Sequence, residues 1–203
     1  MKKMFVIAAA AAALGAYSSV QAAGDPAAGK TKSTTCAACH GADGNSVAPN
    51  FPKLAGQAES YLLKQLHDFK SGVRKNATMQ PMVAGLNDQD MADLAAYFSS
   101  QKVTGGKADP KLVAEGEKLF RGGDPASGTA ACAGCHGPTG AGNPAAKFPA
   151  LSSQHAQYIE AQLKAFRSGE RTNDAGKMME GVTAKMSDAQ IAAVASYIDG
   201  LQR

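Results

Sequence analysis

The sequence predicts an all-α protein made of two tandem domains that arose by duplication of one unit. Three observations lead to this fold class: a repeat that covers most of the chain, apolar residues at helical spacing in both copies, and no stretch of sustained β-type alternation. The chain has four cysteines, and they divide equally between the copies. We therefore expect two similar helical domains, each built around its own pair of cysteines.

The repeat becomes visible when the two halves are aligned on the motif Cys-x-x-Cys-His. The offset between matching residues changes only between conserved blocks, as expected for surface loops. The join 102–110 contains Gly105, Gly106 and Pro110 and is the expected linker, with domains at 23–101 and 111–203. The matching blocks, first copy against second, are Cys36 with Cys132, 50–76 with 147–173, and 86–101 with 186–201.

Each copy contains the same series of predicted helices. A long amphipathic helix has apolar residues at a spacing near 3.6 and stops at a glycine, and a last helix follows a capping pair. "LVAEGEKLF" before the second motif predicts an opening helix, for which "AAGKTKSTT" is the weaker counterpart. The long helices are expected over 59–69 and 156–166 before Gly72 and Gly169, and the capping pairs are Asn87 with Asp90 and Ser187 with Gln190.

The N-terminus has the pattern of a secretory signal peptide. Lys2 and Lys3 precede an apolar run that is short for a membrane span, and small residues follow up to Ala22. We therefore expect residues 1–22 to be removed and the protein to be exported. The net charge of +4 is modest, and the chain has no basic cluster with interleaved aromatic residues. This composition argues against nucleic acid as a partner.

The expected cores are thin. The chain has no Trp, seven Phe and five Tyr, and much of its apolar fraction is Ala, which buries little area per residue. Two domains of this size would be marginal alone, which predicts a large apolar cofactor. Without that cofactor, each domain should lack cooperative unfolding.

The Cys-x-x-Cys-His motif allows four interpretations, and c-type haem attachment gives every residue a role. Two thiols add to the haem vinyl groups, and the adjacent histidine supplies its imidazole to the iron. A redox dithiol lacks the expected βαβ context here, and a histidine directly after the second cysteine does not easily join a tetrahedral zinc site. A buried structural pair leaves the histidine unexplained. The candidate residues are Cys36, Cys39 and His40 in the first copy and Cys132, Cys135 and His136 in the second.

The sixth iron ligand is predicted from recurrence in the repeat. In this part of the repeat, each residue of the first copy matches the residue 100 positions later, so Met79 matches Met179. Met82 and Met178, the nearest rivals, have no methionine counterpart. His67 and His155 are not kept between copies and are interpreted as surface helix residues. Histidine and methionine would close both axial positions, which suits electron transfer better than substrate activation.

The chain resembles the dihaem cytochrome c4 family, exported electron carriers with two class I cytochrome c domains. The resemblance spans the whole mature chain and includes "APNFPKLAGQ", "YLLKQLHDFKSG", "DQDMADLAAYFSSQK", "GEKLFRGG" and "FRSGERTND". It implies two covalent haem c groups that face each other across a pseudo-twofold domain interface. It also implies a periplasmic monomer, loosely associated with the inner membrane, that feeds a terminal oxidase from a donor such as a quinol–cytochrome c reductase.

The resemblance further implies a proline whose carbonyl orients the axial histidine, and we expect this to be Pro49. The second copy has Ala146 at the matching position, so we expect the two haems to differ in potential. Recurring aromatic residues are interpreted first as haem-pocket and packing residues. The alternatives to a free carrier are a dihaem peroxidase, a cytochrome subunit of a dehydrogenase and a gas sensor. The aromatic pairs are Phe51 with Phe148, Tyr61 with Tyr158, and Tyr97 with Tyr197.

Overall fold

The computed structural model describes residues 23–202. Residues 1–22 and 203 lie outside this range, and so does the predicted signal peptide. No helix within 23–202 is long and apolar enough to cross a membrane. This range is helical and contains no strand beyond two isolated bridges, Asp124 with Thr129 and Asn143 with Phe148.

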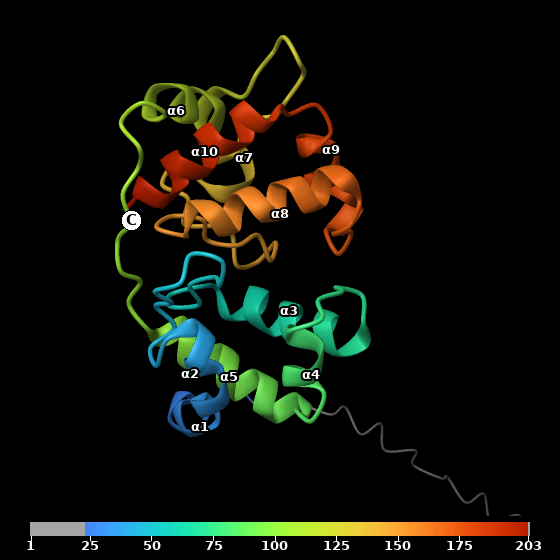
Figure 1. Cartoon of the computed structure of the whole chain (residues 1–203). Coiled ribbons are helices and arrows are strands. Elements are labelled where there is room, and N and C mark those ends of the chain that lie inside the picture. The colour runs from blue at the N-terminus through green and yellow to red at the C-terminus, as the bar shows by residue number, and fades with distance from the viewer. Residues whose placement is uncertain (1–22, 203) are drawn as a thin grey trace, which may run out of the picture.

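Two series of helices follow each other along the chain, and Figure 1 shows them stacked, with residues 101–112 joining them along one edge. The N-terminal half comprises α1 (Pro26–Lys32), α2 (Thr34–His40), α3 (Glu59–Ser71), α4 (Met79–Val83) and α5 (Asp88–Ser100). The C-terminal half comprises α6 (Val113–Gly122), α7 (Ala133–His136), α8 (Ala156–Ser168), the 3₁₀ turn η1 (Ala175–Lys177), α9 (Met178–Thr183) and α10 (Asp188–Gly200). The all-α fold with two like units is confirmed.

The helix boundaries follow the local signals in the sequence. The side chains of Asn87 and Ser187 each cap a helix in a reciprocal capping box with the residue three positions later. Gly72 and Gly169 end the long helices with φ values of 77° and 74°, which glycine adopts without a steric penalty.

In each half, the first helix crosses the last helix at a glycine. A Cβ on Gly29 would lie 2.0 Å from the Asp93 carbonyl oxygen, and one on Gly116 would lie 2.3 Å from that of Ala193. The same two glycines face Tyr97 and Tyr197, which are therefore packing residues of these crossings. The Tyr97 hydroxyl also donates to the Ala42 carbonyl at 2.8 Å and so ties the crossing to the loop after α2.

Candidate functional site

Each Cys-x-x-Cys-His motif lies on one short helix, α2 in the N-terminal half and α7 with its N-cap in the C-terminal half. Helical spacing places the two cysteines three residues apart on one face, with the histidine beside them. All four cysteines are free thiols. Burial raises the pKa of Cys36, and it raises the pKa of Cys132 to about 11. A reactive dithiol has a lowered thiol pKa, which these surroundings do not provide. Within 23–202, no three His, Cys, Asp or Glu side chains gather into the ligand set that a zinc site of protein groups needs.

The two motif histidines are held in the same way. His40 Nδ1 lies 2.9 Å from the Pro52 carbonyl oxygen, and His136 Nδ1 lies 2.9 Å from that of Pro149. Both histidines are buried, and burial lowers their pKa against the opposing effect of the carbonyls. A neutral ring that donates from Nδ1 keeps its lone pair on Nε2, and within 23–202 neither Nε2 has a hydrogen-bond partner. The rings are therefore prepared as metal ligands.

This geometry corrects the prediction about Pro49. The carbonyl that orients His40 belongs to Pro52, three residues later, and its counterpart in the repeat is also a proline, Pro149. The second copy has Ala146 where the first has Pro49, and this difference therefore does not affect the carbonyl that orients His136. The exchange of Pro49 for Ala146 therefore no longer supports the expected difference in potential between the two haems.

Aromatic rings line both histidines at matching places. The ring centroids of His40 and Phe51 are 6.2 Å apart, and those of His136 and Phe148 are 6.1 Å apart. These two phenylalanines thus lie beside the candidate ligands, as the prediction of a pocket role requires. Two phenylalanines at equivalent positions give each site the same apolar wall.

The methionines separate into three groups by burial. Met91 and Met186 are buried in the cores, and Met82 and Met178 are 43% and 41% exposed. Met79 and Met179 are half-buried, at or near the start of α4 and α9. The backbone N–H of Met79 donates to Asn76 Oδ1 at 2.9 Å, and that of Met179 donates to Asp174 Oδ2 at 2.6 Å. Two short helices of like position therefore present a methionine that its loop holds in place.

Two further histidines have different surroundings. His67 Nδ1 lies 4.0 Å from Asp88 Oδ1 at the surface, as predicted. His155, however, is half-buried at the N-cap of α8, and its Nε2 lies 2.8 Å from the Ser46 carbonyl oxygen of the N-terminal half. The interpretation of His155 as a surface helix residue was wrong. The first copy has no histidine at the matching position, so comparison of the copies does not indicate this contact.

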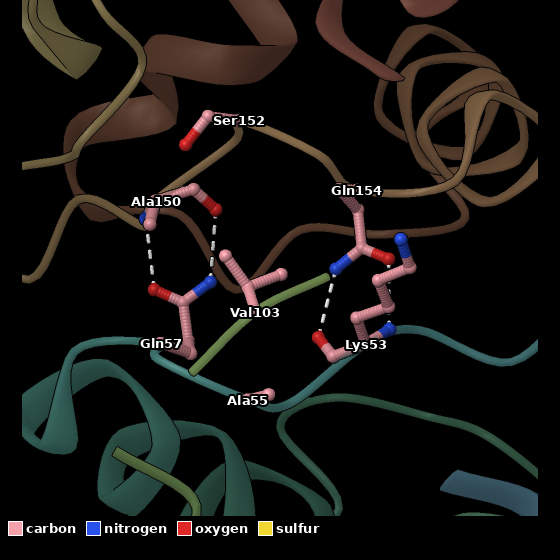
Figure 2. Close-up of a pocket in the computed structure, with 7 residues that line it drawn as sticks. All are labelled: Lys53, Ala55, Gln57, Val103, Ala150, Ser152 and Gln154. Atoms are coloured by element: carbon pink, nitrogen blue, oxygen red, sulfur yellow. Dashed lines mark hydrogen bonds between the residues drawn. The ribbon is translucent and has the colours of Figure 1, made fainter. Parts of the chain in front are cut away.

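The interface between the halves repeats the internal symmetry. The Gln57 side chain accepts from Ala150 N–H at 2.8 Å and donates to the Ala150 carbonyl at 2.9 Å, and Gln154 makes the same pair of bonds with the Lys53 backbone. Figure 2 shows both pairs on either side of Val103. Each glutamine thus bonds both backbone groups of one residue in the opposite half. Gln57 and Gln154 are equivalent in the repeat, so the docking itself is twofold.

Comparison with known proteins gives consistent matches along the chain. The family model described as cytochrome c matches residues 26–102 and again 113–202. The chain is 58% identical to cytochrome c4 of Pseudomonas aeruginosa, covering 93% of this chain and 94% of that protein. It is 55% identical to the reduced recombinant cytochrome c4 from Pseudomonas stutzeri, with a TM-score of 0.86 over 89% of this chain and 100% of that one. It is also 43% identical to the thiosulfate dehydrogenase electron acceptor of Thiomonas intermedia, over 85% of this chain and 81% of that protein.

Proposed function

Because the chain belongs to the cytochrome c family and, within it, to the dihaem cytochromes c4, it is an electron-transfer protein with two covalently bound haem c groups, and we propose that it carries electrons in the periplasm towards a terminal oxidase of the respiratory chain. The observation that carries this proposal is the pair of neutral, carbonyl-held histidines, each beside two free thiols. The basic and apolar pattern of residues 1–22 supports export.

The residues of each half divide the work of holding one haem. Cys36 and Cys39 would attach the first group and Cys132 and Cys135 the second. His40 and His136 would supply Nε2 to the iron, while the Pro52 and Pro149 carbonyls fix the ring planes. When bound, haem supplies one-electron cycling of its iron between the ferrous and ferric states.

Met79 and Met179 are our proposed sixth ligands. Their recurrence in the repeat and their partial burial favour them over the more exposed Met82 and Met178. Asn76 and Asp174 accept from the backbone N–H of each methionine and so fix the loop from which its thioether would reach the iron. A neutral, soft thioether from Met79 or Met179, together with the motif histidine, would leave no iron position for a small molecule. Equal ligand sets in both halves favour a carrier over a peroxidase.

The spectrum of the reduced holoprotein with and without carbon monoxide tests the carrier. We expect an unchanged spectrum, because a histidine and a methionine would close each iron. Met79→Ala and Met179→Ala should each open one iron and shift about half of the haem absorbance. Met82→Ala and Met178→Ala are the matched controls and should stay closed. A wild-type shift in half of the haem would mean one open iron, and an open iron in Met82→Ala would transfer the ligand assignment to that residue.

A second donor is worth testing because of one relative. The acceptor of thiosulfate dehydrogenase in Thiomonas intermedia is 43% identical to this chain over 85% of the chain. We propose that a dehydrogenase of this class is an alternative source of electrons. Stopped-flow reduction of the oxidised holoprotein by a thiosulfate dehydrogenase and by a quinol–cytochrome c reductase compares the two donors directly. The faster donor by at least tenfold is the physiological class, and slow reduction by both would reject both.

A further inference from the structure

Two equivalent arginines lie in the loops that lead to the proposed methionine ligands. Arg74 follows α3 and Arg171 follows α8. Their backbone N–H groups donate back to the ends of these helices, Arg74 to the Asp68 carbonyl at 2.9 Å and Arg171 to the Ala165 carbonyl at 3.0 Å. Each loop therefore starts with the same turn and the same side chain.

Each arginine first contacts its own half. The Arg74 guanidinium lies 4.6 Å from the Phe69 ring centroid and donates to Gln65 Oε1 at 2.8 Å. Arg171 repeats both contacts, at 4.4 Å from the Phe166 ring centroid and 2.8 Å from Gln162 Oε1. The ring face and the amide oxygen hold each guanidinium in a fixed plane.

Other guanidinium N–H groups of each arginine donate across the interface. Arg74 donates to the Tyr158 hydroxyl at 3.1 Å and to Gln162 Oε1 at 2.8 Å. Arg171 donates to the Tyr61 hydroxyl at 3.1 Å and to Gln65 Oε1 at 3.3 Å. Arg74 is only 9% exposed, so separation of the halves would remove acceptors from a buried charged group. The loop conformation is consequently coupled to docking. Tyr61 and Tyr158 were expected in the haem pocket or in packing, and their hydroxyls accept the hydrogen bonds from Arg171 and Arg74 across the interface.

The same loops continue directly to the methionines. Asn76, two residues after Arg74, accepts from the backbone N–H groups of Thr78 and Met79. In the other loop, Arg171 Nε donates to Asn173 Oδ1 at 2.9 Å, and the next residue, Asp174, accepts from Met179 N–H. In the C-terminal half, a hydrogen bond to Asn173 and one peptide link thus join Arg171 to the residue that holds the Met179 backbone. In the N-terminal half, the connection from Arg74 to Asn76 is two residues of backbone.

We propose that Arg74 and Arg171 are positioning residues that hold Met79 and Met179 through contacts with the opposite domain. The sixth ligand of each haem then depends on the docking of the other half. This inference rests on the proposed function only in taking Met79 and Met179 as ligands. It assigns a ligand-holding role to the interface and to Tyr61 and Tyr158, which touch neither methionine in any described contact.

The dependence is greater for Met179 than for Met79. Asn173 Nδ2 donates across the interface to Gln65 Oε1 at 3.0 Å and to Asp68 Oδ2 at 2.6 Å, and its carbonyl accepts from Lys64 Nζ at 2.8 Å. Asn76, its counterpart, is exposed and bonds within its own loop. The loop before Met179 therefore has two residues anchored in the opposite half, where the loop before Met79 has one.

The test uses the ferric holoprotein and crossed tyrosine variants. Tyr158→Phe removes an acceptor of Arg74, and Tyr61→Phe removes an acceptor of Arg171. Imidazole displaces a weakly held methionine, and paramagnetic NMR resolves the methionine methyl signal of each haem. Signals are assigned with Met79→Ala and Met179→Ala. If neither removes a signal, the ligand assignment of the proposed function fails, which is distinct from failure of the coupling.

We expect Tyr158→Phe to increase imidazole affinity at the N-terminal haem by roughly tenfold, and Tyr61→Phe to do so at the C-terminal haem. Tyr97→Phe, which removes a hydroxyl contact inside one half, is the matched control and should leave the C-terminal haem unchanged. Arg74→Lys combined with Tyr158→Phe should weaken Met79 no more than Arg74→Lys alone. Effects confined to the haem of the mutated half, additive effects in this pair, or no effect would overturn the proposal.

Discussion

The two halves share one helix crossing but fill it with different chemistry. Three residues after the crossing glycine, the N-terminal half has Lys32, whose Nζ lies 2.5 Å from Asp93 Oδ2, and the C-terminal half has Leu119, which is buried. Opposite them, Asp93 in α5 corresponds to Ala193 in α10. An ion pair and an apolar pair therefore occupy equivalent places at the two glycine crossings. The duplication has kept the close approach of the backbones while the side chains between them changed.

The cores differ in the same direction. Phe120, Ile191, Val194 and Ile198 give the C-terminal half a continuous apolar cluster around its crossing. The N-terminal cluster consists of Leu62, Leu94, Ala95, Tyr97 and Phe98. Phe69, Val83 and Met91 are buried in the N-terminal half as well, but outside this cluster. Because contiguous apolar burial is the main favourable contribution to folding, we expect the N-terminal half to have less stability of its own. It should depend more on its haem and on polar contacts.

Loss of haem should have the largest effect. Cys36→Ala with Cys39→Ala, and Cys132→Ala with Cys135→Ala, each prevent attachment in one half. We expect each haem-free half to lose about 5 kcal/mol, enough to abolish its cooperative transition, and the N-terminal half to lose more helix. Thermal unfolding followed by circular dichroism measures both. A sharp transition in a haem-free N-terminal half would contradict the comparison.

Exchange of the ion pair for the apolar pair should have the next largest effect. Lys32→Leu alone leaves the Asp93 carboxylate, which is 3% exposed, without its cation and should clearly lower the denaturation midpoint. Adding Asp93→Ala reproduces the pair of the C-terminal half, and we expect it to recover most of the loss. Chemical denaturation gives both values. Glu117→Gln, in the exposed ion pair with Arg121, is the control and should leave the midpoint nearly unchanged. A double variant less stable than Lys32→Leu would show that the two pairs are not interchangeable.

Low pH should destabilise the N-terminal half more than the C-terminal half, by a smaller amount than the exchange of the ion pair. The Asp25 backbone N–H, followed by Lys32 and Gln89, lowers the pKa of Asp93 to about 2. An aspartate in an unfolded chain has a pKa of about 3.9. The contribution of Asp93 to the free energy of unfolding is therefore complete above that pH and is lost as the pH falls towards 2. The N-terminal half should therefore unfold first below about pH 4. Spectra of the two haems recorded against pH test the order, and the Lys32→Leu, Asp93→Ala variant should be less sensitive to acid.

The repeat made the fold predictable, because recurrence separates constrained positions from free ones. The criterion that selected Met79 and Met179 would also have selected Pro52, since Pro52 matches Pro149 at the offset of 97. Pro49 has no such counterpart. The resemblance points to Pro49, whereas recurrence in the repeat points to Pro52, whose carbonyl orients His40.

Recurrence alone could not assign every conserved pair to its role. Gln57 with Gln154, and Arg74 with Arg171, recur as clearly as the haem-site residues, yet they form the domain interface. A repeat shows that a position is constrained but not whether a pocket, a core or a docked neighbour constrains it. The contact of His155 with Ser46 breaks the symmetry, so no comparison of the copies could have revealed it.

The smallest predicted effect concerns the potentials of the two haems. The backbone at Met79 is held by a neutral amide, Asn76, and that at Met179 by a carboxylate, Asp174. A negative charge beside an iron stabilises its ferric state, so Asp174→Asn should raise the potential of the C-terminal haem by an equivalent of about 1 kcal/mol. Asn76→Asp is the matched exchange and should lower the potential of the N-terminal haem.

Spectroelectrochemical titration of each variant resolves the two steps, with the unmutated haem as the internal reference. Opposite shifts of similar size would identify the charge that holds the methionine loop as a cause of the difference between the halves. Equal potentials in the wild type that neither exchange separates would mean that solvent screens both positions, and the two loops would then differ only in their anchoring across the interface.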